Sequence, residues 1–169
     1  MEKEFARLDS THRKLLDLIE PVDDERFARR PSPNEWSIAE IVHHLCMVEQ
    51  RVIDELERAL AAPPFRMGLL QRLMPVGFLV GSRVVRVKAP RAVEPLDAPS
   101  KEEAIANYQS VRARLKEFSA RLGRGRLEQL AMKHPFLGKF DGVRAVEFAG
   151  HHERRHCKQI KETIRKISK

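Results

Sequence analysis

The sequence predicts an all-α protein folded as a four-helix bundle. Four segments carry apolar residues at the three-and-four spacing of an amphipathic helix, and two long connections rich in proline and glycine interrupt them. At 169 residues the chain has the length of one domain with one sizeable core. We therefore expect residues 1–169 to form a single domain in which each helix buries one face.

The first half of the chain predicts two of the four helices. Apolar residues recur along Glu2 to Glu20, and a proline at the next position ends this helix. Residues 21–34 contain three prolines and are expected to form a loop. Ser37 and Glu40 have the spacing of a capping box, which begins a second helix that runs to about residue 61.

The middle of the chain is irregular in its pattern. Residues 62–100 contain repeated prolines and glycines, with a short apolar helix expected at 67–74 and an extended or helical segment at 78–87. A connection of this length between helices is uncommon unless it covers a site or an interface. We therefore expect it to influence which molecules reach a site on the bundle.

The second half of the chain predicts the other two helices. A capping box of Ser100 and Glu103 begins the third helix, which is expected to end near Leu122 where two glycines follow. Residues 126–142 are expected to be mostly loop. The last helix is predicted at 142–167 with an aspartate as its cap.

Composition and charge limit the classes of function. No stretch approaches the run of about eighteen apolar residues that a membrane span needs, and the first residues lack the apolar region of a secretory signal, so a cytoplasmic protein is expected. The net charge of +8 favours anionic partners in general. The basic clusters contain no interleaved aromatic residues, which argues against nucleic-acid binding. Cys46 and Cys157 are expected to be reduced thiols.

Histidines on the second and last predicted helices have the geometry of a metal site. His152 and His156 are four residues apart and lie on one helix face, whereas His151 is rotated away from both. On the second helix, His44 lies at the margin of the apolar stripe and His43 points toward the polar face. We therefore predict His44, His152 and His156 as metal ligands.

The string His152-Glu153-Arg154-Arg155-His156 also matches the H-E-x-x-H motif of zinc metalloproteases, with Glu153 as general base. Such proteases normally take a third ligand well downstream, and only thirteen residues follow His156 in this chain of 169. No strand-rich part is available to frame a peptide substrate. These features argue against a protease.

Two stretches near opposite ends of the chain resemble the DinB-like superfamily. Residues 36–45 resemble its W-S-x-x-E-(I/L)-x-x-H-L signature. Residues 134–138, followed by 152–160, resemble its closing pattern, H-P-x-x-G and then H-x-x-x-H-x-x-Q-I. The resemblance covers nearly the whole chain and matches loosely only at 62–100.

This resemblance implies a fold and a cofactor. The expected fold is an up-up-down-down four-helix bundle, and the expected cofactor is a divalent metal ion, zinc or nickel. Its ligands match His44, His152 and His156 of this chain. Helical phase places none of Glu49, Glu153 and Gln159 clearly beside these ligands, so their roles stay open.

The resemblance also implies a class of activity. Its characterised members are thiol-dependent transferases and isomerases that use mycothiol, bacillithiol or glutathione, or metal-dependent hydrolases. We therefore expect a metal-dependent thiol S-transferase or hydrolase that acts on a small molecule. The alternative is a non-catalytic binding or stress-response module with a structural or vestigial metal site. Bundles of this kind often pair through a helical face, so a homodimer is an expected assembly.

Overall fold

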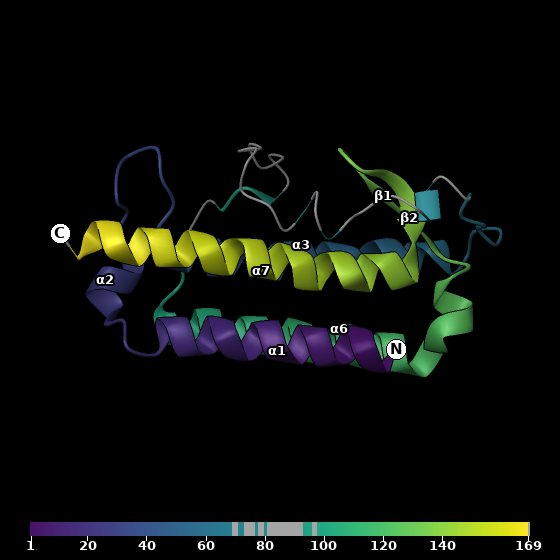
Figure 1. Ribbon diagram of the computed structural model, residues 1–169, viewed down its shortest axis with the longest axis horizontal. Helices are drawn as coiled ribbons and strands as arrows, with labels where there is room; N and C mark the ends of the chain where they lie inside the picture. The colour runs from purple at the N-terminus through teal and green to yellow at the C-terminus, as the bar shows by residue number, and fades with distance from the viewer. Residues whose placement is uncertain (69–70, 73–76, 78–79, 81–92, 96–97, 169) are drawn as a thin grey trace.

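Four long helices make up most of the protein. The computed structural model describes residues 1–68, 71–72, 77, 80, 93–95 and 98–168. The long helices are α1 (Glu2–Ile19), α3 (Ile38–Ala59), α6 (Lys101–Leu127) and α7 (Gly142–Ile167), and they lie side by side (Figure 1). None of the helices in these described ranges is long and apolar enough to cross a membrane. The predicted four-helix bundle is confirmed.

The directions of the helices follow from contacts between them. Lys101, at the start of α6, donates to the carbonyls of Glu20 and Val22 just after α1, so these two helices are antiparallel. In contrast, α1 and α7 are parallel, as are α3 and α6 (Figure 1). In chain order the helices therefore run up, down, down and up, which corrects the up-up-down-down order implied by the resemblance. The reason is that the chain reverses at one end of the bundle between α1 and α3, and that α6 begins again at this same end, next to the end of α1.

The predicted helix starts are confirmed by their caps. Ser37 and Ser100 each accept a hydrogen bond from the backbone N–H three residues on, and the glutamates at those positions accept in return. Asp141 accepts from the N–H of Arg144 at 2.9 Å and begins α7. These bonds satisfy backbone donors that the first turn of a helix leaves without partners.

Three local features differ from the sequence-based expectations. The expected loop after α1 contains the short helix α2 (Asp24–Ala28), which begins because the side chain of Asp23 accepts from the N–H of Arg26. The chain between α6 and α7 contains an antiparallel hairpin of β1 (Ala131–His134) and β2 (Gly138–Asp141). Gly123 has a φ of 68° and interrupts α6, but helical turns resume beyond it. The segments expected at 67–74 and 78–87 lie largely outside the described residues.

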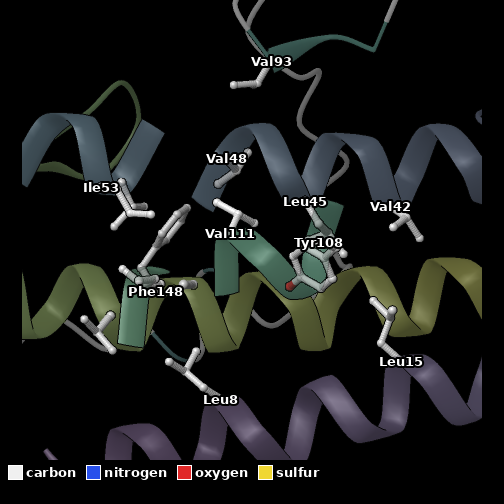
Figure 2. Packing of buried hydrophobic residues seen from close by; sticks show 14 of the residues in the cluster. Leu8, Leu15, Val42, Leu45, Val48, Ile53, Val93, Tyr108, Val111 and Phe148 are labelled. Atoms are coloured by element: carbon white, nitrogen blue, oxygen red, sulfur yellow. The ribbon is translucent and has the colours of Figure 1, made fainter. Parts of the chain in front are cut away.

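An apolar core fills the space between the helices. Figure 2 shows side chains from all four long helices meeting there, and fully burying one leucine-sized side chain stabilises a fold by about 1.5–3 kcal/mol. The core includes Leu8, Leu15, Leu45, Leu56, Tyr108, Leu115, Phe148 and Ile160. Cys46 and Cys157 are free thiols, as expected.

A polar cluster crosses this apolar core. The guanidinium of Arg112 on α6 binds the carboxylates of Glu49 on α3 and Glu153 on α7, and all three side chains are buried. Tyr108 donates to Glu49 at 2.9 Å, and Thr11 of α1 donates to Glu153. This cluster, which we call the Arg112 cluster, therefore connects all four long helices.

Candidate metal centre

Three histidines from the two ends of the chain meet between α3 and α7. The ring centroids of His44 and His152 are 5.2 Å apart, those of His44 and His156 are 4.9 Å apart, and those of His152 and His156 are 4.5 Å apart. One ligand nitrogen from each ring lies within 4.8 Å of the other two. His44 and His156 are buried and His152 is half-buried. The structure thus brings together all three predicted ligands, while metal binding by them stays a prediction.

Two of the three rings make a hydrogen bond through Nδ1. The Nδ1–H of His44 donates to the carbonyl of Val93 at 2.7 Å. The Nδ1 of His156 lies 2.9 Å from the Oε1 of Gln159, which fits donation to that amide oxygen. In both rings the Nε2 lone pair is then directed toward the shared space, because the neutral imidazole has its hydrogen on Nδ1.

The spacing of the Nε2 atoms suits a metal ion. The Nε2 atoms of His152 and His156 are 3.1 Å apart. In a tetrahedral site with Zn–N bonds of about 2.0–2.1 Å, two ligand nitrogens are about 3.3 Å apart. Two basic nitrogens that face each other at this distance, with a third nearby, fit a divalent ion that takes imidazole ligands.

Burial favours the neutral form of His44 and His152. Burial lowers the pKa of His44, and His43 lowers it further. Burial also lowers the pKa of His152 well below its ordinary value, with additional lowering by His156 and His44. Because only a neutral imidazole nitrogen can coordinate a metal ion, this environment favours the ligand form of both side chains.

Aromatic rings form the walls beside the three histidines. Trp36, just before α3, lies with its ring centroid 5.0 Å from that of His44. Phe148 of α7 stacks on His152 at 5.3 Å with an interplanar angle of 20°. These ring contacts restrict the orientation of His44 and His152. The tryptophan belongs to the W-S signature, but the sequence reasoning assigned no role to either ring.

His134 is a fourth histidine of the site region. Its Nδ1 accepts hydrogen bonds from the backbone N–H groups of Phe136 and Leu137, each at 3.2 Å, so its hydrogen is on Nε2. Its ring packs edge-on against Phe148 at 4.9 Å. Burial, together with the positive charge of Arg51, lowers the pKa of His134 to about 4. The H-P-x-x-G pattern singled out this histidine, but only the hairpin places it next to the ring that stacks on His152.

The two histidines next to the predicted ligands, His151 on α7 and His43 on α3, are not part of the three-histidine group. His151 is directed toward α1, where its Nε2 lies 3.1 Å from Nη1 of Arg7. His43 on α3 is half-exposed, next to the buried His44. Their exclusion from the three-histidine group agrees with the helical phase.

Glu153 lies in the core and not in the metal centre. Its Oε2 accepts from Thr11 and from Arg112, the latter at 3.1 Å, and Nδ1 of His12 is 3.5 Å from Oε1. Burial raises the pKa of Glu153, but His12, Arg112 and Thr11 together hold it below its ordinary value. The ionised carboxylate of Glu153 is therefore part of the Arg112 cluster, and so is that of Glu49. The sequence alone had left the roles of both glutamates open. Gln159, the third residue whose role the sequence left open, lies within hydrogen-bonding distance of the ring of His156.

Comparisons with known proteins agree with this architecture. The chain is 28% identical over 152 residues to the uncharacterised protein YuaE of Bacillus subtilis (strain 168), which covers 89% of this chain and 91% of that protein. The crystal structure of TT2238, a four-helix bundle protein, superposes with a TM-score of 0.65 at 21% identity and covers 95% of this chain and 98% of TT2238.

A second solved structure is similar to the same extent. YfiT from Bacillus subtilis, described as a probable metal-dependent hydrolase with an unusual four-helix bundle topology, superposes with a TM-score of 0.65 at 16% identity. The match covers 99% of this chain and 87% of YfiT. The sequence model of the DinB superfamily matches residues 7–160, which is most of the chain. The chain therefore belongs to the DinB superfamily.

Proposed function

We propose that the protein binds one divalent metal ion through His44, His152 and His156 and acts with it on a small molecule, as a hydrolase or a thiol S-transferase. The observation that carries this proposal is the convergence of three imidazoles, two of which have Nδ1 engaged and Nε2 directed inward. The description of YfiT as a probable metal-dependent hydrolase supports the same class.

The number of protein ligands bears on the type of site. Structural zinc sites are closed by four protein ligands, whereas catalytic sites have three and leave a position open. When bound, a divalent ion lowers the pKa of a coordinated water or thiol and so supplies a nucleophile near neutral pH. Zinc and nickel both accept imidazole ligands of this kind.

Side chains around the centre have separate tasks in this proposal. The carbonyl of Val93 and the amide of Gln159 orient two of the ligand rings. Trp36 and Phe148 contact ligand rings and restrict their orientation. His134 retains a hydrogen on Nε2 and can donate it to a polar group of the substrate. Glu153 is engaged by Arg112 and Thr11, so we assign it no part in proton transfer.

Metal content tests the ligand assignment. The protein is stripped with a chelator, reloaded with zinc or nickel and analysed by mass spectrometry, in parallel with His44→Ala, His152→Ala and His156→Ala. We expect one ion per chain in the native protein and a loss of affinity of 100-fold or more, an order-of-magnitude estimate, in each variant. His43→Ala is the matched control, since this half-exposed neighbour of His44 should leave metal binding unchanged. Stoichiometric metal that survives all three ligand substitutions would disprove the assignment.

Turnover tests the reaction class. The metal-loaded and metal-stripped proteins are compared on activated esters and on monochlorobimane with cysteine, glutathione or bacillithiol. A metal-dependent rate on either substrate class supports the proposal and distinguishes hydrolase from transferase. If metal binds but no rate exceeds that of the stripped protein across the panel, a binding module replaces the enzyme.

A further inference from the structure

A groove lies along α3 and is lined in part by Val93, whose carbonyl accepts a hydrogen bond from His44. It has a volume of about 520 Å³. Among the described residues, its lining comes from α3 and from Val93 and includes Cys46, Met47, Gln50, Arg51, Asp54, Glu55, Arg58 and Val93. Val93 connects the groove to the centre, because its carbonyl holds His44 and Figure 2 shows it beside α3, on the side away from α1.

Most charged groups in this groove already have partners. Arg58 pairs with Glu55 at 3.2 Å, and the carboxylate of Asp54 accepts from the side-chain amide of Gln50 at 2.6 Å. Arg51 is half-buried, and among the described residues its guanidinium has no hydrogen bond or ion pair. A half-buried guanidinium without a carboxylate partner provides several unused donors.

Arg51 lies at a defined position relative to the metal centre. It follows His44 by seven residues on the same face of α3, which corresponds to about 10 Å along the helix axis. His134 lies near the metal centre: strand β1, to which it belongs, packs against α3, and its ring contacts Phe148, which stacks on His152.

We propose that Arg51 binds an anionic group of the substrate, a carboxylate or a phosphate, while the reacting end of the same molecule lies at the metal centre about 10 Å away. The proposal rests on the proposed function for the position of the reacting end. It adds the substrate class: a small, elongated molecule with a negative charge at the end remote from the chemistry. The Nε2–H of His134, whose ring packs against Phe148 beside His152, provides a further hydrogen-bond donor near the reacting end.

The chemistry of Arg51 favours an anion over a neutral group. A guanidinium binds a carboxylate or phosphate through two parallel hydrogen bonds, and such charge-assisted bonds are about twice as strong as neutral ones. The net charge of +8 attracts anions to the surface in general, but only a partner-free arginine in a groove selects where one binds.

Bifunctional thiols test the distance and the charge together. The cobalt-loaded protein is titrated with mercaptohexanoate, mercaptohexyl phosphate and the neutral mercaptohexanol, and the sulfur-to-cobalt absorption band reports binding. We expect an anionic probe to bind about 10-fold more tightly than the alcohol, as one charge-assisted contact provides. The better of the two anions identifies the terminal group. In Arg51→Gln this preference for an anion should fall to about twofold or less. Arg58→Gln is the control and should retain the preference, because the guanidinium of Arg58 already pairs with Glu55 in the native protein.

A second measurement does not depend on the metal. In the metal-free protein, the side-chain N–H resonance of Arg51 is followed by nuclear magnetic resonance during titration with hexanoate or hexyl phosphate, with hexanol as control. We expect saturable shifts with an anion only, with little change at Arg58. Thiols that bind cobalt with no preference for an anion overturn this inference and leave the proposed function standing. Failure of cobalt to bind overturns the proposed function, whereas cobalt binding without thiol binding overturns only its thiol-transferase form. In either case the resonance of Arg51 decides whether the anion subsite exists.

Discussion

His152 and Glu153 are consecutive residues of α7, yet their side chains enter two different environments. His152 lies 3.1 Å, nitrogen to nitrogen, from His156 in the metal centre. Glu153 lies 3.1 Å from the guanidinium of Arg112 in the core of the bundle. The step of about 100° between neighbouring residues of a helix separates them. The string H-E-x-x-H therefore serves two tasks here, and the glutamate holds α7 against α1 and α6.

Glu153→Gln should reduce stability much more than metal affinity. The amide cannot balance the charge of Arg112, so the buried cluster loses one of its two carboxylates. We expect the free energy of unfolding to fall by about 2–4 kcal/mol, near the range for a broken buried ion pair, with zinc affinity changed by less than about tenfold. Urea denaturation and competition with a chromophoric chelator measure the two quantities. A loss of turnover with normal stability and normal zinc affinity would instead return Glu153 to the role of general base.

Arg112→Met should be among the most damaging single substitutions in the core. It leaves the carboxylates of Glu49 and Glu153 buried without a cation, at a cost of about 3–5 kcal/mol. Combining it with Glu49→Gln and Glu153→Gln removes both charges, and we expect part of the lost stability to return. Chemical denaturation of the single and triple variants measures this. Equal instability of the two would mean that packing, and not charge, governs the cluster.

Gln159→Leu should weaken metal binding without unfolding the protein. The amide oxygen lies 2.9 Å from Nδ1 of His156, and losing such a partner of a ligand typically lowers metal affinity about 10–100-fold. Gln129→Leu is the control, because this exposed glutamine lies at the end of α6, where Arg126 donates to it. Zinc affinity by competition titration and thermal stability are measured for both variants. Unchanged affinity in Gln159→Leu would show that the hydrogen bond does not support the ligand.

The metal-free protein should lose stability below about pH 6.5, the ordinary pKa of histidine. The folded state lowers the pKa of His134 and His151 to about 4, and it also lowers those of His44 and His152. As the pH falls from about 6.5 toward 4, these histidines bind protons in the unfolded chain but stay neutral in the folded protein. Unfolding therefore becomes more favourable as the pH falls.

Thermal unfolding of the stripped protein at a series of pH values measures this effect. Saturating zinc should raise the midpoint at pH 7, and this gain should shrink as the pH falls because protons compete for the ligand nitrogens. His151→Asn removes one of the four groups and should reduce the pH dependence. A midpoint that stays constant between pH 7 and 5 would contradict the lowered pKa values.

The helices and the three predicted ligands could be derived from the sequence because both depend on local periodicity. The positions of His44, His152 and His156 relative to the apolar stripes decide which histidines lie inside the bundle. The capping boxes predicted the helix starts for the same reason, since a cap involves residues only three apart. The hairpin escaped prediction because its strands have four residues each, too short for an alternating pattern to be distinctive.

By itself, the sequence determined which residues form helices, which face each helix buries and which histidines that face contains. Only the tertiary structure decided that the carbonyl of Val93 orients His44, that Glu153 pairs with Arg112, and that His134 packs against the ring that stacks on His152. The physical reason is the distance along the chain over which each interaction acts. Helical phase and capping act over a few residues, whereas these contacts join residues far apart in the chain and depend on how whole helices pack.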